Sequence, residues 1–403
     1  MKRYTGVVIA FLGFWMATRV CSQVAVKGEV VYTSASDPIQ NGVVLVKNGK
    51  IDRVGPAARI SIPADYKILT GKVVTPGIID AHTVVGLAGY FNNKEDQDQL
   101  EKSAPIQPEL RAIDAYNSRE KLVQWVRSLG VTTIHTGHAP GALVSGQTMI
   151  TKTAGASEVA ILKPTAMVAV TLGKSVSDNF KSPGTRSKSV AMLRTALIKA
   201  QTYAKKLKKS DTDKRPERDL EMEMLAKVLN REIPALVTAQ KATDIMSALR
   251  LANEFGFDLV LDGAAEAYLL LDEIKAAKIP VIIHPTMVRN FGDTQNATYA
   301  TAAKLQAAGI PFAFQSGYEN YVPKTRMVHY EAAIAVSDGL AFQDALAALT
   351  IASARILGID QRVGSLEKGK DADMVVFDGD PFEYTTHVCA VVIDGTVVSA
   401  DCR

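Results

Sequence analysis

The chain has 403 residues, of which 47% are hydrophobic and 22% are charged, and its formal net charge at pH 7 is +4. This length allows one large α/β unit with a smaller satellite domain. Acidic and basic residues are interspersed, and no Lys/Arg block with interleaved aromatic residues occurs, which argues against a nucleic-acid-binding protein. The most basic stretch, residues 205–209, ends a helical pattern and is interpreted as a solvated helix end.

The first 22 residues predict a secretory signal peptide. Two basic residues precede an uncharged apolar run at residues 7–17, which is too short to span a bilayer. Ser22 supplies a small residue at the expected cleavage point. We therefore expect a periplasmic or secreted protein with no membrane span after cleavage. An uncleaved membrane anchor is the alternative interpretation.

Both ends of the remaining chain have the pattern of short strands joined by tight turns. Residues 24–74 contain an Asn48-Gly49 turn between two apolar runs, and the last forty residues contain an Asp394-Gly395 turn in the same setting. We expect residues 23–75 and 361–403 to form one small composite β-sandwich domain.

The second of these hairpins brings two cysteines near each other. Folding the chain at Asp394-Gly395 makes Cys389 and Cys402 diagonal neighbours on adjacent strands. A disulfide is compatible with an oxidising compartment, and so are two free thiols at a frayed chain end.

The middle of the chain alternates between helical patterns and short runs of β-forming residues. Such alternation predicts parallel strands joined by crossover helices. The helical patterns cover residues 118–128, 219–229, 244–255, 265–277 and 299–308, and the β runs that follow them cover residues 131–135, 233–237, 259–261, 281–283 and 310–314. We therefore expect an α/β fold with a TIM-like (β/α)8 barrel over residues 76–360, whose functional residues lie just after each strand.

Three stretches resemble the amidohydrolase superfamily. They are Val-Val-Thr-Pro-Gly-Ile-Ile-Asp-Ala-His at residues 73–82, Gly-Val-Thr-Thr at residues 130–133, and residues 354–373. The first looks like the family's first barrel strand, and the last looks like its passage from the final helix back into the β domain. Within the superfamily the chain is most similar to secreted imidazolonepropionase-like and prolidase-like proteins, and residues 108–115 also fit that group.

The resemblance implies hydrolysis of C–N bonds in amides and related groups. In the family, one or two divalent metals, here zinc, iron or manganese, polarise the carbonyl and lower the pKa of a bound water. The usual ligands are a His-x-His pair after the first strand, a carboxylated Lys or a Glu after the fourth, a His after each of the fifth and sixth, and an Asp after the eighth.

Most of these ligand positions carry other residues in this chain. Matching by motif retains His82 of the first pair, while the other expected positions fall on Val84, Ala169, Thr238, Gly263 and Gly317. Asp262 lies beside its expected position. Aliphatic side chains and glycine have no lone pair to donate, so the family's usual metal centre is not encoded here.

Other polar residues follow the expected strands and define the candidate site. A relocated single-metal site would use His82 and His284, with Glu319 as a third catalytic group. Arg289, Tyr318 and Arg326 are candidates for binding a substrate anion, or are ordinary surface residues.

Three functional hypotheses remain open from the sequence. The first is an exported hydrolase of carbon–nitrogen bonds that acts on a small amide or dipeptide-like substrate, with a remodelled or weakened metal site. The second is a catalytically inactive, metal-free member of the fold that serves as a binding or partner subunit, as a homo-oligomer or with an intact amidohydrolase. The third is metal-free hydrolysis by Ser316 and His284, which no nucleophile-elbow pattern supports.

Overall fold

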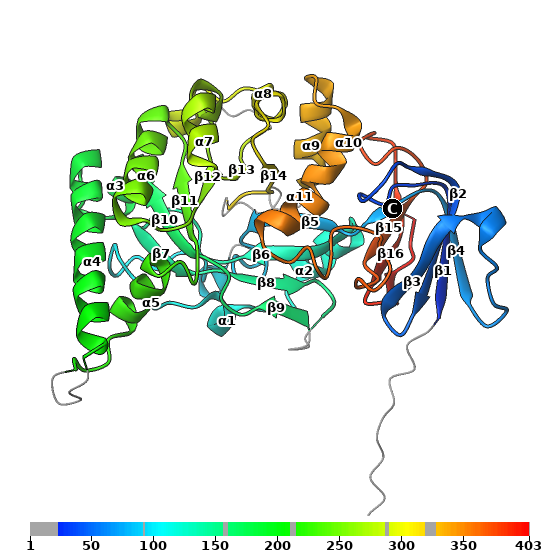
Figure 1. The fold of residues 1–403 in the computed structure, drawn as a ribbon, viewed down its shortest axis with the longest axis horizontal. Coiled ribbons are helices and arrows are strands. Elements are labelled where there is room, and N and C mark those ends of the chain that lie inside the picture. Colours follow the sequence, from blue (N-terminus) through cyan, green and yellow to red (C-terminus); the bar gives the residue numbers. More distant parts are fainter. Residues whose placement is uncertain are drawn as a thin grey trace, which may run out of the picture.

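The computed structural model describes residues 23–91, 93–155, 160–209, 215–286, 290–318 and 328–402. It has an α/β fold in which strands from the two chain ends lie together at one side of the molecule (Figure 1). The predicted signal peptide and the candidates Arg289, Glu319 and Arg326 fall outside the described residues. Within those residues, no helix combines the length and the apolar character needed to cross a membrane.

The strands from both chain ends form one seven-stranded sheet, in the order β17-β16-β15-β4-β1-β2-β3. Its members are β1 (Val24–Val31), β2 (Ile39–Lys47), β3 (Lys50–Pro56), β4 (Lys67–Pro76), β15 (Met374–Phe377), β16 (Val388–Ile393) and β17 (Thr396–Ser399). The antiparallel pair β4–β15 joins the two chain ends. The strand pairing gives one sheet, so the two-layered sandwich is not confirmed, and the domain boundaries stay predictions.

The two predicted hairpin turns are present in this sheet. Asn48 and Asp394 adopt φ values of 53° and 48°, and the glycine after each is also left-handed. This is the backbone that a two-residue hairpin turn with right-handed strand twist requires. At the second hairpin Cys389 and Cys402 form a disulfide.

The central strands form a six-stranded sheet and a four-stranded sheet. The first has the order β14 (Phe312–Phe314), β13 (Val281–Ile283), β12 (Leu259–Gly263), β11 (Ala235–Ala239), β10 (Val168–Leu172) and β7 (Val144–Gln147). The second has the order β5 (Ile78–Thr83), β6 (Val131–Thr136), β8 (Met149–Lys152) and β9 (Ile161–Lys163). Each β run expected from the sequence overlaps one of these strands, and the runs at 233–237 and 310–314 begin two residues before β11 and β14.

A closed eight-stranded barrel is not detected among the described residues. The consecutive strands β7 and β8 run antiparallel to β10 and β6, so this segment divides its pairing between the two sheets. On the opposite side the sheets meet through one isolated parallel bridge, between Thr83 and Gly317. The sequence predicted the parallel strands but gave no signal for this antiparallel segment.

Helices cover the central sheets (Figure 1). They are α1 (Ala112–Ala115), α2 (Lys121–Ser128), α3 (Lys174–Asn179), α4 (Arg186–Leu207), α5 (Leu220–Leu229), α6 (Ala242–Phe255), α7 (Leu271–Ala277), α8 (Thr301–Ala308), α9 (Val328–Ser337), α10 (Phe342–Ala348) and α11 (Ile351–Ile356). The side chains of Thr185 and Asp219 cap α4 and α5. Lys205 and Lys206 are exposed at the end of α4, which confirms the solvated helix end.

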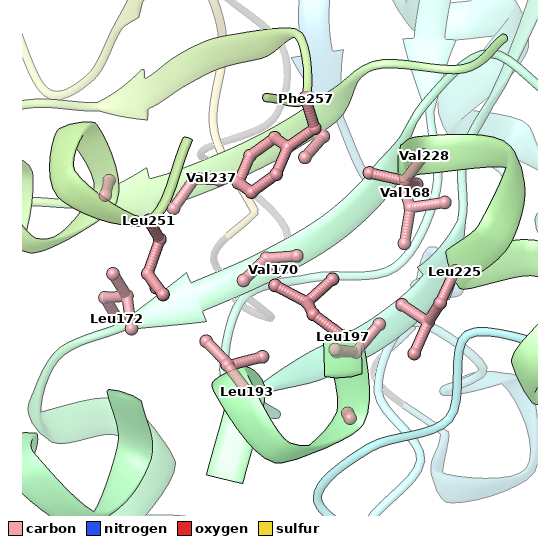
Figure 2. Close-up of a pocket in the computed structure, with 14 residues that line it drawn as sticks. Val168, Val170, Leu172, Leu193, Leu197, Leu225, Val228, Val237, Leu251 and Phe257 are labelled. Carbon is pink, nitrogen blue, oxygen red and sulfur yellow. The ribbon is translucent and has the colours of Figure 1, made fainter. Parts of the chain in front are cut away.

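Alternation along the strands decides which residues meet the helices. Every second residue of β10 and β11, such as Val170 and Val237, packs against Leu197 of α4, Leu225 of α5 and Leu251 of α6 (Figure 2). This apolar packing leaves a cavity of only about 30 Å³. The face of these strands toward the helices is therefore core, and the functional residues have to come from the opposite face.

The opposite face carries one apolar layer and, above it, one polar layer. Leu236, Val260, Ile282 and Ala313, one from each of β11 to β14, belong to a single buried cluster. Two residues further along the chain from each of these stand Thr238 and Asp262, within β11 and β12, and His284 and Gln315, directly after β13 and β14; all four are buried. Because side chains two residues apart lie on one face of a strand, these four residues form a polar layer at the carboxyl ends of the strands.

Candidate functional site

The carboxylate of Asp262 is the centre of the polar layer. It accepts hydrogen bonds from His82 Nδ1 at 2.9 Å, from Gln315 Nε2 at 2.6 Å and from the Thr238 hydroxyl. Thr238 and Asp262 are direct neighbours in the β11–β12 register, which explains their contact. Burial alone would raise the pKa of Asp262, but the nearby His82 and the three donated hydrogen bonds outweigh it and lower this pKa.

The ionised Asp262 fixes the orientation of His82. Because a carboxylate only accepts hydrogen bonds, His82 carries its proton on Nδ1. The other ring nitrogen, Nε2, is buried and has no hydrogen-bond partner among the described residues. A buried polar atom without a partner costs free energy, so its retention at the end of a strand marks it as a candidate functional atom.

Two glycines at the expected ligand positions make room for other polar side chains. A Cβ atom on Gly317 would lie 2.5 Å from Cε1 of His284, and one on Gly263 would lie 2.5 Å from Nε2 of Gln240. Both glycines have left-handed φ values, 89° and 75°, which disfavour any other residue. The space next to these backbones is therefore filled by the imidazole of His284 and the amide of Gln240.

Tyr318 links these side chains to the buried histidine. Its ring centroid lies 5.6 Å from that of His82 and 5.6 Å from that of His284. Gln240 Nε2 donates to the Tyr318 hydroxyl at 3.0 Å, and Gln240 Oε1 accepts from the backbone of Ala265. The structure thus brings His82, His284 and Tyr318 together, as the sequence analysis expected of neighbouring strand ends.

A pocket of about 450 Å³ opens above this cluster, and we call it the mouth pocket. Its floor includes Thr238, His284 and Tyr318. The remaining lining residues are Pro140, Thr171, Leu172, Lys174, Ser175, Asp178, Gln240, Pro285, Phe291, Gly292, Asp293 and Thr294. Thr238 lines the pocket and donates a hydrogen bond to Asp262, and Tyr318 lines the pocket and contacts the ring of His82.

Ser316 does not pair with His284, contrary to the serine–histidine hypothesis. Its hydroxyl donates to Asp80 and lies 3.1 Å from the Thr83 hydroxyl, and its backbone N–H donates to Asp80 at 3.0 Å. Burial raises the pKa of Asp80 to about 7, and the hydrogen bonds from Ser316 oppose this shift. Ser316 therefore joins β5 to the end of β14, where the two central sheets meet.

The other histidines lie outside the hydrogen bonds of the polar layer, although the ring of His135 lies 5.6 Å from that of His82. His135 binds the Ala81 carbonyl through Nδ1 and Thr148 through Nε2, and burial lowers its pKa to about 3. Burial likewise lowers the pKa of His138 to about 4 and that of His329 to about 4. His387 pairs with Asp378 on the surface of the seven-stranded sheet. His135 and His387 thus have hydrogen-bond partners of their own, whereas both ring nitrogens of His138 and Nδ1 of His329 are buried without a hydrogen-bond partner among the described residues.

The residues at the ligand positions expected from the sequence do not fit a metal centre of the usual kind. Val84, Ala169, Gly263 and Gly317 offer no donor atom, and Thr238 gives its proton to Asp262. Within the described ranges, the group of three or more His, Cys, Asp or Glu ligand atoms that converge is Asp378, Cys389 and Cys402, and these two cysteines are joined in a disulfide. His82 and His284 thus lack a converging third ligand in that part of the chain.

Sequence matching missed two members of the polar layer. It placed the sixth-strand ligand position on Gly263, whereas the inward residue is Asp262, and it did not single out Gln315. Counting alternate residues along each strand could have found both. Each member of the polar layer, Thr238, Asp262, His284 and Gln315, stands two residues after an apolar residue that points inward.

The central strands form an α/β fold with polar functional groups at their carboxyl ends, and comparison with known proteins gives the family. Residues 87–399 match the model described as "Amidohydrolase family". A solved structure of an amidohydrolase from Thermotoga maritima superposes with a TM-score of 0.87 at 31% identity, covering 94% of this chain and 100% of that one. The chain therefore belongs to the amidohydrolase family.

Two characterised relatives are more distant. Imidazolonepropionase from Fusobacterium nucleatum is 23% identical over 398 residues, which cover 90% of this chain and 92% of that protein. Amidohydrolase tasK from Hapsidospora irregularis is 26% identical over 389 residues, 88% of this chain. The match spans only 39% of the length of tasK, so it concerns one part of that protein.

Proposed function

We propose that the protein hydrolyses a C–N bond of a small-molecule amide at the mouth pocket, with the His82–Asp262 pair as its general base. The observation that carries the proposal is the buried His82 Nε2, which has no partner among the described residues and is held in one tautomer by Asp262. Family membership and the imidazolonepropionase relative support hydrolysis of a small substrate.

The chemistry follows from the two ring nitrogens of His82. With its proton on Nδ1, the ring has a lone pair on Nε2 that can take a proton from an attacking water. The resulting imidazolium is stabilised by the ionised Asp262. After water adds to the carbonyl carbon, the same proton can pass to the departing nitrogen, so that the C–N bond breaks and an acid and an amine form.

The substrate would reach His82 past Tyr318. This ring lies against His82 and also lines the mouth pocket, while His82 itself is fully buried. His82 does not line the pocket, so Tyr318 would have to move aside for a substrate to reach Nε2, which would break the hydrogen bond that Gln240 donates to its hydroxyl. Amidohydrolases use divalent metals, but the residues present do not fit that group, so no step is assigned to a metal.

The test combines an activity panel with one matched pair of variants. Wild type, His82→Gln and the surface control His387→Gln are assayed on cyclic amides, N-acyl amino acids and Xaa-Pro dipeptides, with and without a chelator. We expect a chelator-insensitive rate that falls by about 100-fold or more in His82→Gln only. No hydrolysis across the panel would contradict the proposal.

Elemental analysis of the same proteins tests the choice of base. About one equivalent of zinc, iron or manganese that is lost in His82→Gln, together with a chelator-sensitive rate, would replace the general-base role of His82 by metal ligation. Metal at background level in all three proteins, with activity retained in wild type, supports the role proposed for His82.

We also propose that the first 22 residues direct export to the periplasm or the medium. Their basic start and short apolar run support this proposal. Fractionation of a bacterial host and mass measurement of the mature chain test it. A full-length product in the cytosol would contradict it.

A further inference from the structure

A second cleft lies beside the mouth pocket, and we call it the rim cleft. Its volume is about 470 Å³, and Gly173, Lys174, Ser177, Gly184, Thr185, Arg186, Ser189, Lys241, Gly292 and Asp293 line it. Lys174, Gly292 and Asp293 also line the mouth pocket. The two cavities are therefore adjoining parts of one binding region at the carboxyl ends of β10 and β11.

Three cationic side chains line the rim cleft. Lys241 has no ion-pair partner within the described ranges. Lys174 pairs with Asp178, but both side chains are more than half exposed, so a ligand anion can replace that pair at little cost. Arg186 donates its Nε to Asp244 at 2.7 Å, and its terminal Nη2 lies 3.8 Å from Asp293 Oδ1, so this guanidinium already stands between two carboxylates.

The carboxylates near the cleft are already engaged. Asp244 is buried and holds Arg186, and Asp293 Oδ2 accepts the backbone N–H of Lys174 at 2.8 Å. Asp293 Oδ1 lies 3.8 Å from Arg186. These acids position Arg186 and the loop after β10, although the buried Asp244 Oδ2 has no hydrogen-bond partner among the described residues, and Lys241 lines the cleft without an ion pair in those residues.

Two long helices begin at the rim cleft. The first residue of the 22-residue α4 is Arg186, and Lys241 immediately precedes the 14-residue α6. The first N–H groups of a helix lack intrahelical partners, and the helix dipole makes this end attractive to anions. The Thr185 side chain satisfies only the N–H of Lys188 in the first turn of α4. At α6 the Glu266 carboxylate already accepts the N–H of Ala242 at 2.7 Å, so it is the start of α4, together with the lysines, that favours an anionic ligand.

We propose that the rim cleft binds an anionic group of the substrate, a carboxylate or a phosphate, while the C–N bond lies in the mouth pocket. This inference rests on the proposed hydrolysis and narrows it to substrates with an anionic group remote from the cleaved bond. Lys241 is the principal contact, the start of α4 provides N–H donors, and Asp244 and Asp293 hold Arg186 at the wall of the cleft.

Direct binding tests the cleft without any need for activity. Inorganic phosphate and acetate are titrated separately into wild type, Lys241→Ala and the control Lys199→Ala, which removes an exposed lysine from the middle of α4. We expect the preferred anion to bind about tenfold more weakly to Lys241→Ala than to the other two proteins, and more weakly at higher salt. No binding, or equal binding in all three proteins, would overturn the proposal.

Kinetics separates this inference from the proposed function. KM is measured for two substrates, an amide with a remote carboxylate or phosphate and its neutral analogue. We expect the KM of the neutral analogue divided by the KM of the anionic amide to fall about tenfold in Lys241→Ala. The same ratio should stay unchanged in Lys199→Ala. An active enzyme with an unaltered ratio would overturn the anion site alone. An inactive enzyme that binds the anion through Lys241 would overturn the hydrolysis alone.

Discussion

His82 Nδ1 lies 2.9 Å from Asp262 Oδ1, and both side chains are buried at the carboxyl ends of strands from different sheets. His82 comes from β5 and Asp262 from β12, so this hydrogen bond connects the four-stranded and six-stranded sheets across the polar layer. The pair therefore serves two purposes: it joins the sheets and it fixes the tautomer of the proposed base.

Replacing Asp262 by Asn separates these roles. An amide has one acceptor oxygen for the three donors that now meet the carboxylate, so at least one donor loses its partner. We expect a loss of about 2 kcal/mol in unfolding free energy and a fall of about 100-fold or more in kcat. Urea unfolding and steady-state assays measure the two effects, with the exposed Asp272→Asn on α7 as control. An Asp262→Asn rate equal to that of the control would exclude Asp262 from catalysis.

Restoring the family's acid at position 317 should fail to restore a metal centre. In Gly317→Asp the new Cβ would overlap the His284 ring, and the backbone φ of 89° would strain any residue with a side chain. We expect a loss of about 2–4 kcal/mol in stability and no gain of bound metal.

Gly309→Asp is the matched control for that change, because its φ is 70° and its added Cβ would meet no atom within 4 Å. The control isolates backbone strain from the clash with His284. If Gly317→Asp were as stable as Gly309→Asp and bound one equivalent of zinc, the space beside Gly317 would be a latent ligand position after all.

The sequence predicted the parallel strands and the two hairpins because each depends on local signals. Runs such as residues 281–283 are apolar and lie between helical patterns, and Asp394-Gly395 supplies the left-handed turn that a hairpin requires. The strands β7 and β8 are too short for their pattern of residues to show which neighbouring strand each one pairs with, or whether the pairing is parallel or antiparallel. The antiparallel segment, and with it the break in the barrel, depends on tertiary pairing.

The candidate site was predicted in its location but not in its connections. His82, His284 and Tyr318 were expected at strand ends because parallel strands bring their carboxyl ends to one edge. The role of Asp262 depends on its register with Thr238 and on the approach of His82 from the other sheet, which no local pattern encodes. The family motifs also singled out Gly263 and Gly317. These two glycines matter because they leave space for neighbouring side chains.

Glu120 should make stability depend on pH near neutrality. It is buried, accepts the N–H of Gly86 in the loop that follows His82, and burial raises its pKa from 4.5 to about 7. The folded state therefore keeps a proton that the unfolded state loses between pH 4.5 and 7, so the stability of wild type falls as pH rises through this window.

The isosteric variant Glu120→Gln cannot titrate and still offers an acceptor to Gly86. Relative to this variant, wild type should lose up to about 3 kcal/mol of unfolding free energy between pH 4.5 and 7, and no more above pH 7. Denaturant unfolding at several pH values measures the difference, with the exposed Glu273→Gln as control. A difference that does not change with pH would show that Glu120 is ionised in the folded protein throughout.

Lys152 should be the most sensitive charged residue for stability. It is fully buried on β8 and binds Asp371 at 2.8 Å, Asp373 at 2.9 Å and Asp394, so it links the four-stranded sheet to the C-terminal part of the chain. Burial alone would lower the pKa of Lys152, but the three carboxylates outweigh it and raise this pKa. Removing the ammonium group would leave the buried Asp373 without a cation, whereas Asp371 would keep Lys50 and Arg362.

We therefore expect Lys152→Met to cost about 3–5 kcal/mol of unfolding free energy. Lys50→Met is the matched control, because Lys50 also pairs with Asp371 but its side chain is 51% exposed, and we expect it to cost less than about 1 kcal/mol. Urea unfolding of both variants distinguishes the two environments. Equal losses would mean that water screens the Lys152 cluster as well, and that apolar packing between the sheets, rather than this ion cluster, holds the C-terminal strands against the central region.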